Sequence, residues 1–193
     1  MQDAPWLIVG LGNPGRQYEL NWHNSGFMAL EILAQRNKIE ISRIRCKGLM
    51  GQGRISGQKC LLLRPSTYMN LSGESVREAL AYFKIPLNRC LVLFDDIDIP
   101  VGQIRIRESG GSGTHNGMRS IIGQLNRDDF PRIRIGIGPQ PAQWDIADYV
   151  LSDVPEGNRE LFWQSLNKAA DAVELAVREG LAQAMNLFNR KPI

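Results

Sequence analysis

Short apolar runs alternate along the chain with longer segments in which apolar residues recur at helical spacing, and this alternation constrains the fold most. Buried strands of α/β proteins read as continuous apolar runs, whereas helices that cover a sheet carry one apolar stripe. The pattern therefore predicts an α/β fold: a single twisted, mixed β-sheet covered by helices on both faces, in one domain over residues 1–193. An apolar share of 43% supplies enough material for such a core.

The expected strands are short, and the expected helices lie between them. Strands are predicted at residues 6–9, 50–55, 59–63, 90–94, 103–107 and 132–137, with a hairpin turn at Ser56-Gly57. Helices are predicted from Asn24 or Ser25 to Arg36, from a Ser72 cap to just before Pro86, from Asn116 to Leu125, and from Glu156 onward to about Phe188.

Three of these strands are followed by polar side chains. Asn13, Asn70 and Asp95 are expected in the loops after the first, third and fourth buried runs. In open α/β sheets, the loops at the carboxyl ends of the strands build the ligand site. The sequence therefore predicts one pocket shared by these three residues.

The first of these loops, Gly10-Leu11-Gly12-Asn13-Pro14-Gly15, matches the G-x-G-x-x-G pattern of dinucleotide-binding proteins. That pattern requires a helix to begin at once and its backbone amides to meet the pyrophosphate. Here the next helix is expected only near Asn24, and Pro14 lacks an amide hydrogen. The loop is better explained as a tight turn that presents Asn13.

His23 is the best candidate for a general base. It lies in the polar segment Asn21-Trp22-His23-Asn24-Ser25-Gly26, directly before a helix, and the chain has one other histidine, His115. A neutral imidazole takes a proton from water near pH 7, and it works best when a carboxylate orients the ring. Three carboxylates, Asp95, Asp96 and Asp98, follow the strand at 90–94, and spacing alone does not choose among them.

Two other chemistries are disfavoured by the motifs. Carboxylates with a histidine could hold Mg²⁺ or Zn²⁺, but neither His-x-His nor His-Glu-x-x-His spacing occurs, so a metal site is disfavoured. A covalent serine or cysteine mechanism would be marked by a Gly-x-Ser-x-Gly turn or a comparable motif, and none is apparent. The pattern favours attack by a water molecule that a histidine activates.

Charge distribution indicates a polyanionic partner more clearly than the net charge of +3 does. Residues 41–64 contain six basic side chains and no acid, and residues 103–134 contain six arginines against three acids. Such local patches attract phosphates, although the solvated faces of ordinary strands would show the same pattern.

Three further observations concern the compartment. The three cysteines form no CxxC pair, so buried thiols in a reducing environment are expected. No apolar run is long enough to span a membrane, and no signal peptide is recognised. A cytoplasmic protein is therefore expected.

Taken in order, the motifs GLGNPG, WHNSG, TYMNLSG, FDDIDIP and GTHNG resemble those of the bacterial peptidyl-tRNA hydrolase family, from Leu7 to about Asn189. The resemblance implies a compact, usually monomeric enzyme without metal or cofactor. It implies hydrolysis of the ester between a peptide and its tRNA, so that the tRNA is recycled for translation. Some plant organelle relatives of this fold serve intron splicing, so a noncatalytic RNA-binding protein is the alternative.

The resemblance also implies roles for particular residues. The catalytic base falls on His23 and the orienting acid on Asp95, which resolves the choice that spacing left open. The amides of Asn13, Asn70 and Asn116 would bind substrate, and Asn116 or Asn13 would stabilise the oxyanion, with Asn13 linked to choosing N-blocked substrates. The remaining implied tRNA contacts are two aromatic positions, an apolar wall beside them and two basic positions for acceptor-stem phosphates: Tyr18, Tyr68, Met69, Arg107 and Arg134.

Overall fold

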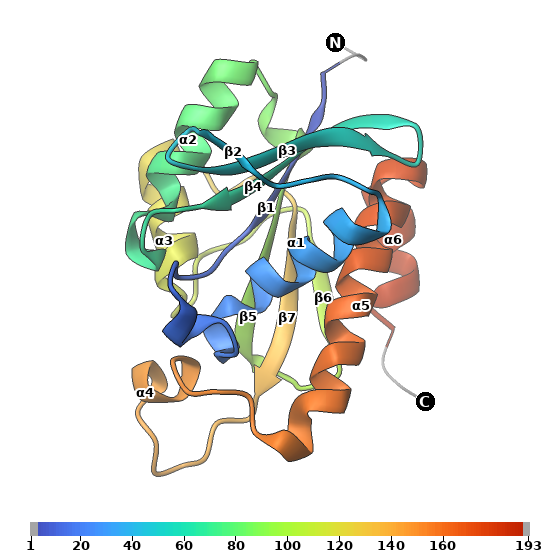
Figure 1. Ribbon diagram of the computed structural model, residues 1–193. Helices are drawn as coiled ribbons and strands as arrows, with labels where there is room; N and C mark the ends of the chain where they lie inside the picture. Colours follow the sequence, from blue (N-terminus) through green and yellow to red (C-terminus); the bar gives the residue numbers. More distant parts are fainter. Residues whose placement is uncertain (1–3, 191–193) are drawn as a thin grey trace.

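The computed structural model describes residues 4–190 and is built around one seven-stranded sheet with the order β2-β3-β4-β1-β5-β7-β6 (Figure 1). The central strands β4, β1, β5 and β7 are parallel, whereas β2, β3 and β6 pair antiparallel with their neighbours. The strands are β1 (Trp6–Gly10), β2 (Arg43–Arg45), β3 (Gly48–Ile55), β4 (Gln58–Pro65), β5 (Cys90–Pro100), β6 (Ile104–Arg107) and β7 (Arg132–Gly138).

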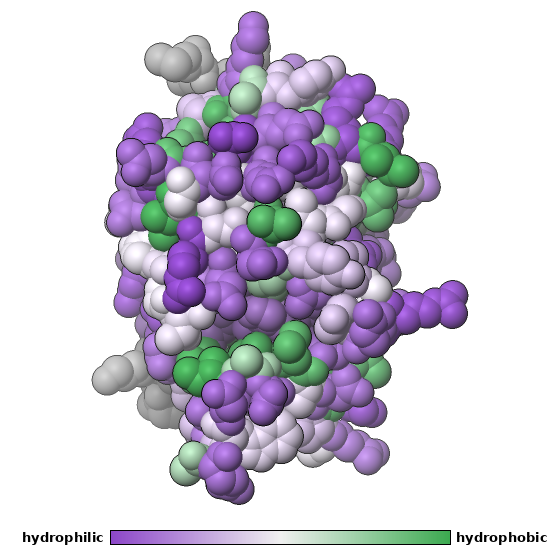
Figure 2. Space-filling model, turned by 90° about the vertical axis from the view of Figure 1, so that its left-hand side faces the viewer, coloured by the Kyte–Doolittle hydropathy of each residue, from purple (hydrophilic) through white to green (hydrophobic). Residues whose placement is uncertain are grey.

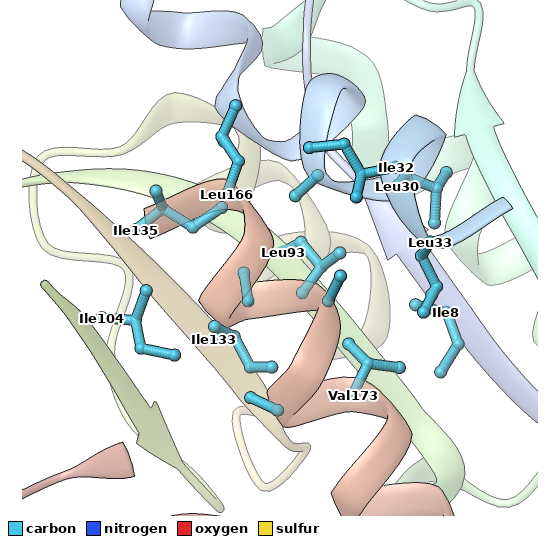
Figure 3. Close-up of a cluster of buried hydrophobic side chains, with 14 of the residues drawn as sticks. Ile8, Leu30, Ile32, Leu33, Leu93, Ile104, Ile133, Ile135, Leu166 and Val173 are labelled. Carbon is cyan, nitrogen blue, oxygen red and sulfur yellow. The ribbon is translucent and has the colours of Figure 1, made fainter. Parts of the chain in front are cut away.

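Helices cover both faces of this sheet, as the sequence predicted. One face packs against α1 (Ser25–Arg36), α5 (Glu156–Glu179) and α6 (Leu181–Phe188), and the other against α2 (Ser72–Phe83) and α3 (Asn116–Leu125). Figure 3 shows the first interface, where isoleucine and leucine side chains of the sheet meet those of α1 and α5. The mixed sheet and its two helical layers confirm the predicted α/β class.

Local sequence explains the hairpin between β3 and β4. Ser56 and Gly57 both have positive φ, 48° and 80°, as a two-residue turn requires if it is to match the twist of its strands. The hairpin pairs eight residues of β3 with β4, ending with Gly48 opposite Pro65. The carboxyl end of β4 is thereby placed beside that of β1.

Three local expectations differ from the structure. β5 continues to Pro100, so Asp95 lies within a strand, opposite Ile135 of β7, and not in a loop. Ser72 is the first residue of α2, and its hydroxyl donates to the carbonyl of Met69 instead of capping the helix. The C-terminal helix is interrupted at Gly180, which separates α5 from α6.

One strand and one α-helix of the described residues were not predicted. The three-residue strand β2 is too short to leave a periodic signal, and α4 (Ile146–Val150) is a five-residue helix. Figure 1 shows α4 in the segment that follows β7, away from the two helical layers. The predicted domain over residues 1–193 extends at both ends beyond the described residues, and it stays a prediction.

Cys46, Cys60 and Cys90 are buried and unpaired, as predicted. Within residues 4–190, no helix combines the length and the apolar character needed to cross a bilayer.

Candidate active site

A cavity of about 980 Å³ brings together nine of the ten residues singled out from the sequence. Figure 2 views the molecule from the side of α2, α3 and α4, where the surface is mostly hydrophilic with a hydrophobic band across its lower part. Tyr18 is the exception: it ends a 3-10 turn (Arg16–Tyr18), is half-buried and does not line the cavity. The nine that do are Asn13, His23, Tyr68, Met69, Asn70, Asp95, Arg107, Asn116 and Arg134.

His23 and Asp95 form a buried pair at the base of this cavity. The Nδ1 atom of His23 lies 3.0 Å and 2.9 Å from the two carboxylate oxygens of Asp95. A carboxylate accepts only, so Nδ1 carries the hydrogen and Nε2 is left as the proton acceptor. Among the described residues, Nε2 has no hydrogen-bond partner, so it is available to a molecule in the cavity.

Close backbone approach places His23 beside the sheet. His23 belongs to a 3-10 turn (Trp22–Asn24) that leads directly into α1 at Ser25 and Gly26. A Cβ on Gly26 would lie 2.3 Å from the carbonyl oxygen of Leu93 and 2.4 Å from the nitrogen of Leu11. Only glycine therefore allows α1 to begin against β5, where the histidine reaches Asp95.

His115 is a second imidazole on the same carboxylate. Its Nδ1 accepts the backbone N–H of Met118 at 3.2 Å, which makes His115 the N-cap of α3. Because Nδ1 is an acceptor, Nε2 must carry the hydrogen, and it donates to Asp95 Oδ1 at 3.0 Å. His115 therefore fixes the carboxylate that orients His23.

These contacts set the charge states of the pair. Burial by itself lowers the pKa of the His23 imidazole, but the negative charge of Asp95 and the hydrogen bond to it outweigh this effect and raise the pKa above 6.5. Burial raises the pKa of the Asp95 carboxyl, yet the two neighbouring imidazoles outweigh it and hold that pKa below its ordinary range. Asp95 is consequently ionised at any pH at which the protein would work.

The amide of Asn13 is oriented by its neighbours. Its side-chain oxygen accepts the backbone N–H of Met69 at 2.8 Å, so its side-chain NH₂ group is left to face the cavity. Asn24 holds the backbone of Asn13 through two bonds, accepting its N–H at 2.8 Å and donating to its carbonyl at 3.0 Å. A fixed amide donor beside a buried imidazole suits the stabilisation of negative charge on a carbonyl oxygen.

Asn70 and Asn116 differ from Asn13 in being exposed on the cavity wall. The side-chain oxygen of Asn116 accepts from Arg119 at 3.0 Å, which again leaves an NH₂ group free. Tyr68 is 57% exposed, whereas Met69 behind it is buried. The loop before α2 thus offers an aromatic face and an amide to a bound molecule.

The arginines of β6 and β7 have different environments. Arg107 is exposed at the cavity, whereas Arg134 is half-buried and its Nε donates to Asp96 at 2.5 Å. Arg132 is almost fully buried, stacks on Phe130, and donates to the carbonyls of residues 110, 111, 128 and 130. It therefore holds the glycine-rich loop before His115 (residues 109–114) against the sheet, and its N–H donors are not free to meet a ligand.

An apolar wall closes the cavity on the side of α4. Ile146 and Leu151 line it and remain partly exposed, at 39% and 42%. Trp22, next to His23, is fully buried between Tyr149 of α4 and Phe162 of α5, with ring centroids 5.9 Å and 5.0 Å away. The wall is thereby joined to the turn that carries the histidine.

Known proteins with similar sequences identify the family of this chain. The family model described as peptidyl-tRNA hydrolase matches residues 7–193. The chain is 50% identical to a peptidyl-tRNA hydrolase of Alkaliphilus oremlandii over 95% of this chain and 98% of the relative, and 46% identical to one of Lachnoclostridium phytofermentans over 97% and 98%. The chain belongs to the peptidyl-tRNA hydrolase family.

A solved structure supports the same assignment. The crystal structure of peptidyl-tRNA hydrolase from Acinetobacter baumannii superposes with a TM-score of 0.91 at 37% identity, covering 97% of this chain and 95% of that one. The family resemblance predicted from the motifs is therefore confirmed over nearly the whole chain. The roles of individual residues in this peptidyl-tRNA hydrolase fold stay predictions.

Three residues of the site were not predicted from the sequence. No local pattern gives His115 a role, because 20 residues separate it from Asp95. The sequence places Arg132 in a basic patch, whereas burial makes it a structural residue. The sequence places Asn24 at the start of a helix, whereas its bonds to Asn13 join segments 11 residues apart that no local pattern connects.

Proposed function

We propose that this protein hydrolyses the ester bond between a peptide and its tRNA, using a water molecule that His23 activates. One observation carries the proposal: both oxygens of Asp95 lie within 3.0 Å of His23 Nδ1, while Nε2 has no partner in residues 4–190 and is left to the cavity that His23 lines. Family membership supplies the substrate class, because the relatives are peptidyl-tRNA hydrolases.

The reaction follows from this arrangement. His23 Nε2 takes a proton from water while the water oxygen bonds to the ester carbonyl carbon. The side-chain NH₂ of Asn13 or Asn116 donates to the oxyanion that forms. When the tetrahedral intermediate collapses, the ribose oxygen of the tRNA leaves and takes the proton back from the imidazolium. The products are a peptide with a free carboxyl group and an intact tRNA.

The substrate contacts form part of the same proposal. Asn13, Asn70 and Asn116 bind the peptide end, and Tyr68 stacks on a base of the acceptor end with Met69 beside it. Arg107 and Arg134 bind acceptor-stem phosphates, and Tyr18, which lies outside the cavity, contacts the tRNA beyond it. The protein acts as a cytoplasmic monomer that is one domain over residues 1–193.

The direct test is to incubate the pure protein with N-acetylaminoacyl-tRNA and to measure release of the N-acetylated amino acid. A noncatalytic RNA-binding relative would bind the tRNA but leave the ester intact. The ionised Asp95 and the oriented His23 support the enzyme over this alternative, because a binding module has no need of a buried acid–base pair.

Hydrolysis is expected to continue after exhaustive treatment with EDTA. His23, Asp95 and His115 are the one grouping of possible ligands found in residues 4–190, with ligand atoms within 4.8 Å of one another. Those atoms already satisfy one another by hydrogen bonds, and a cation would have to break them. A minimal ester substrate should be used, since Mg²⁺ also folds tRNA. Loss of activity in EDTA with recovery on adding Zn²⁺ or Mn²⁺ would replace this mechanism with a metal-dependent one.

A further inference from the structure

One face of the β6–β7 pair is basic. Isoleucines of both strands point into the core under α5, and the alternate residues are arginines on the opposite face. Arg105 lies directly across from Arg134, and Arg107 across from Arg132. Like charges in such cross-strand positions repel each other, so each guanidinium needs a partner that holds it in place.

Asp96 of β5 supplies that partner to Arg134. The Oδ2 atom of Asp96 accepts from Arg134 Nε at 2.5 Å. The Asp96 side chain is 12% exposed and the Arg134 side chain 28%. Its Oδ1 accepts the backbone N–H of Asp98 at 2.9 Å. Because two bonds hold the carboxylate in a partly buried position, it is itself well fixed.

The contact uses one atom of the guanidinium. Arg134 donates to Asp96 through Nε, and within the described residues neither Nη1 nor Nη2 has an acceptor. Arg134 lines the cavity with Arg107 and Arg119. The terminal edge, which offers two parallel N–H donors, matches the two oxygens of a phosphate.

We propose that Asp96 is a positioning residue that holds the Arg134 guanidinium so that its Nη1–Nη2 edge meets a tRNA phosphate. The inference rests on the proposed function for the identity of the phosphate. A fixed fork loses less freedom on binding than a mobile side chain does, so orientation contributes to affinity. The negative charge of Asp96 acts against this gain, and the proposal is that orientation outweighs it.

The sign of the effect distinguishes the proposal from simple electrostatics. If Asp96 only lowered the local positive potential, every substitution that removes its charge would tighten tRNA binding. If Asp96 positions Arg134, Asp96→Ala weakens binding although the site becomes more positive. Asp96→Asn keeps a single acceptor oxygen, which can serve Arg134 Nε but not the Asp98 N–H as well, so it should recover only part of the affinity.

The experiment measures KM and kcat for N-acetylaminoacyl-tRNA, and Kd for deacylated tRNA, in the wild type and in five variants: Asp96→Ala, Asp96→Asn, Asp98→Asn, Arg134→Ala and the double variant Asp96→Ala/Arg134→Ala. Asp96→Ala is expected to raise KM and Kd about tenfold with kcat little changed, the size of one weakened charge-assisted hydrogen bond. Asp98→Asn is the matched control: it removes a carboxylate that lines the same cavity but has no side-chain partner among the described residues. Its KM and Kd should stay within about twofold, or fall slightly.

A double-mutant cycle completes the test. In an Arg134→Ala background, Asp96→Ala should have no further effect on KM or Kd, because its action passes through Arg134. Tighter binding by Asp96→Ala, or an equal effect with and without Arg134, overturns the proposal. Wild-type hydrolysis is measured alongside, so that a protein that binds tRNA without cleaving it overturns the proposed function, while the Kd cycle still reports on Asp96.

Discussion

Replacing His23 with alanine is expected to lower hydrolysis of peptidyl-tRNA by about 10²–10⁴-fold, because removal of a general base costs that much. Among the cavity residues that the structure describes, this imidazole alone combines an unpaired ring nitrogen with an orienting carboxylate. Affinity for deacylated tRNA should change little, because His23 is 7% exposed and lies below the residues proposed to contact the tRNA. Single-turnover kinetics and tRNA binding, measured on the same preparation, separate the two effects.

His115→Ala provides the comparison within the chain. His115 binds the same carboxylate, and its ring centroid lies 4.8 Å from that of His23, but its nitrogens are both occupied. Its loss should slow the reaction less than loss of His23, since Asp95 keeps its bond to His23. A folded His23→Ala protein that hydrolyses substrate at a near-normal rate would refute the proposed mechanism.

Asp95→Asn is expected to slow hydrolysis by about two to four orders of magnitude. An asparagine at this position can turn its NH₂ group toward His23 Nδ1, which then becomes an acceptor. The hydrogen would move to Nε2, and the ring could no longer take a proton from water. Thermal unfolding should be followed in parallel, because the side chain is buried between two imidazoles.

The same substitution should move the pH dependence. Asp95 raises the pKa of His23, and the neutral imidazole is the reactive form, so kcat/KM of the wild type should rise with pH around a midpoint above 6.5. Removal of the negative charge lowers that pKa, so the residual activity of Asp95→Asn should rise at lower pH than in the wild type. Asp98→Asn should leave the midpoint unchanged. If Asp96→Asn or Asp98→Asn is the damaging change and Asp95→Asn is silent, the orienting carboxylate has been misassigned.

Much of the fold could be predicted because period and turn chemistry are local properties. The apolar runs of β1 and β5 and the Ser56-Gly57 turn each identify an element from a few neighbouring residues. Short elements could not be predicted, since the three residues of β2 and the five of α4 each cover less than two periods of their own repeat. The end of β5 could not be predicted either, because a segment with three aspartates is typical of a loop, and the pairing of Asp95 and Asp96 with β7 is not visible in the sequence.

The candidate site was predictable to the extent that its residues fall in motifs. His23 could be inferred from its polar setting, but the choice of Asp95 over Asp96 and Asp98 came from the family resemblance. The structure supplies the physical basis: Asp95 points to the two histidines, whereas Asp96 pairs with Arg134. Such long-range pairings depend on which strands are neighbours, and composition does not determine that.

The placement of Asp95 inside β5 has a consequence for how this site can diverge. The acid belongs to the central ladder of the sheet, whereas Tyr68, Asn70 and the glycine-rich loop before His115 lie in connections outside it. Connections accept sequence change far more readily than paired central strands do. Descendants of this protein can thus acquire new preferences for peptide or tRNA by exchanging rim residues, while the orienting carboxylate of Asp95 is inherited unaltered.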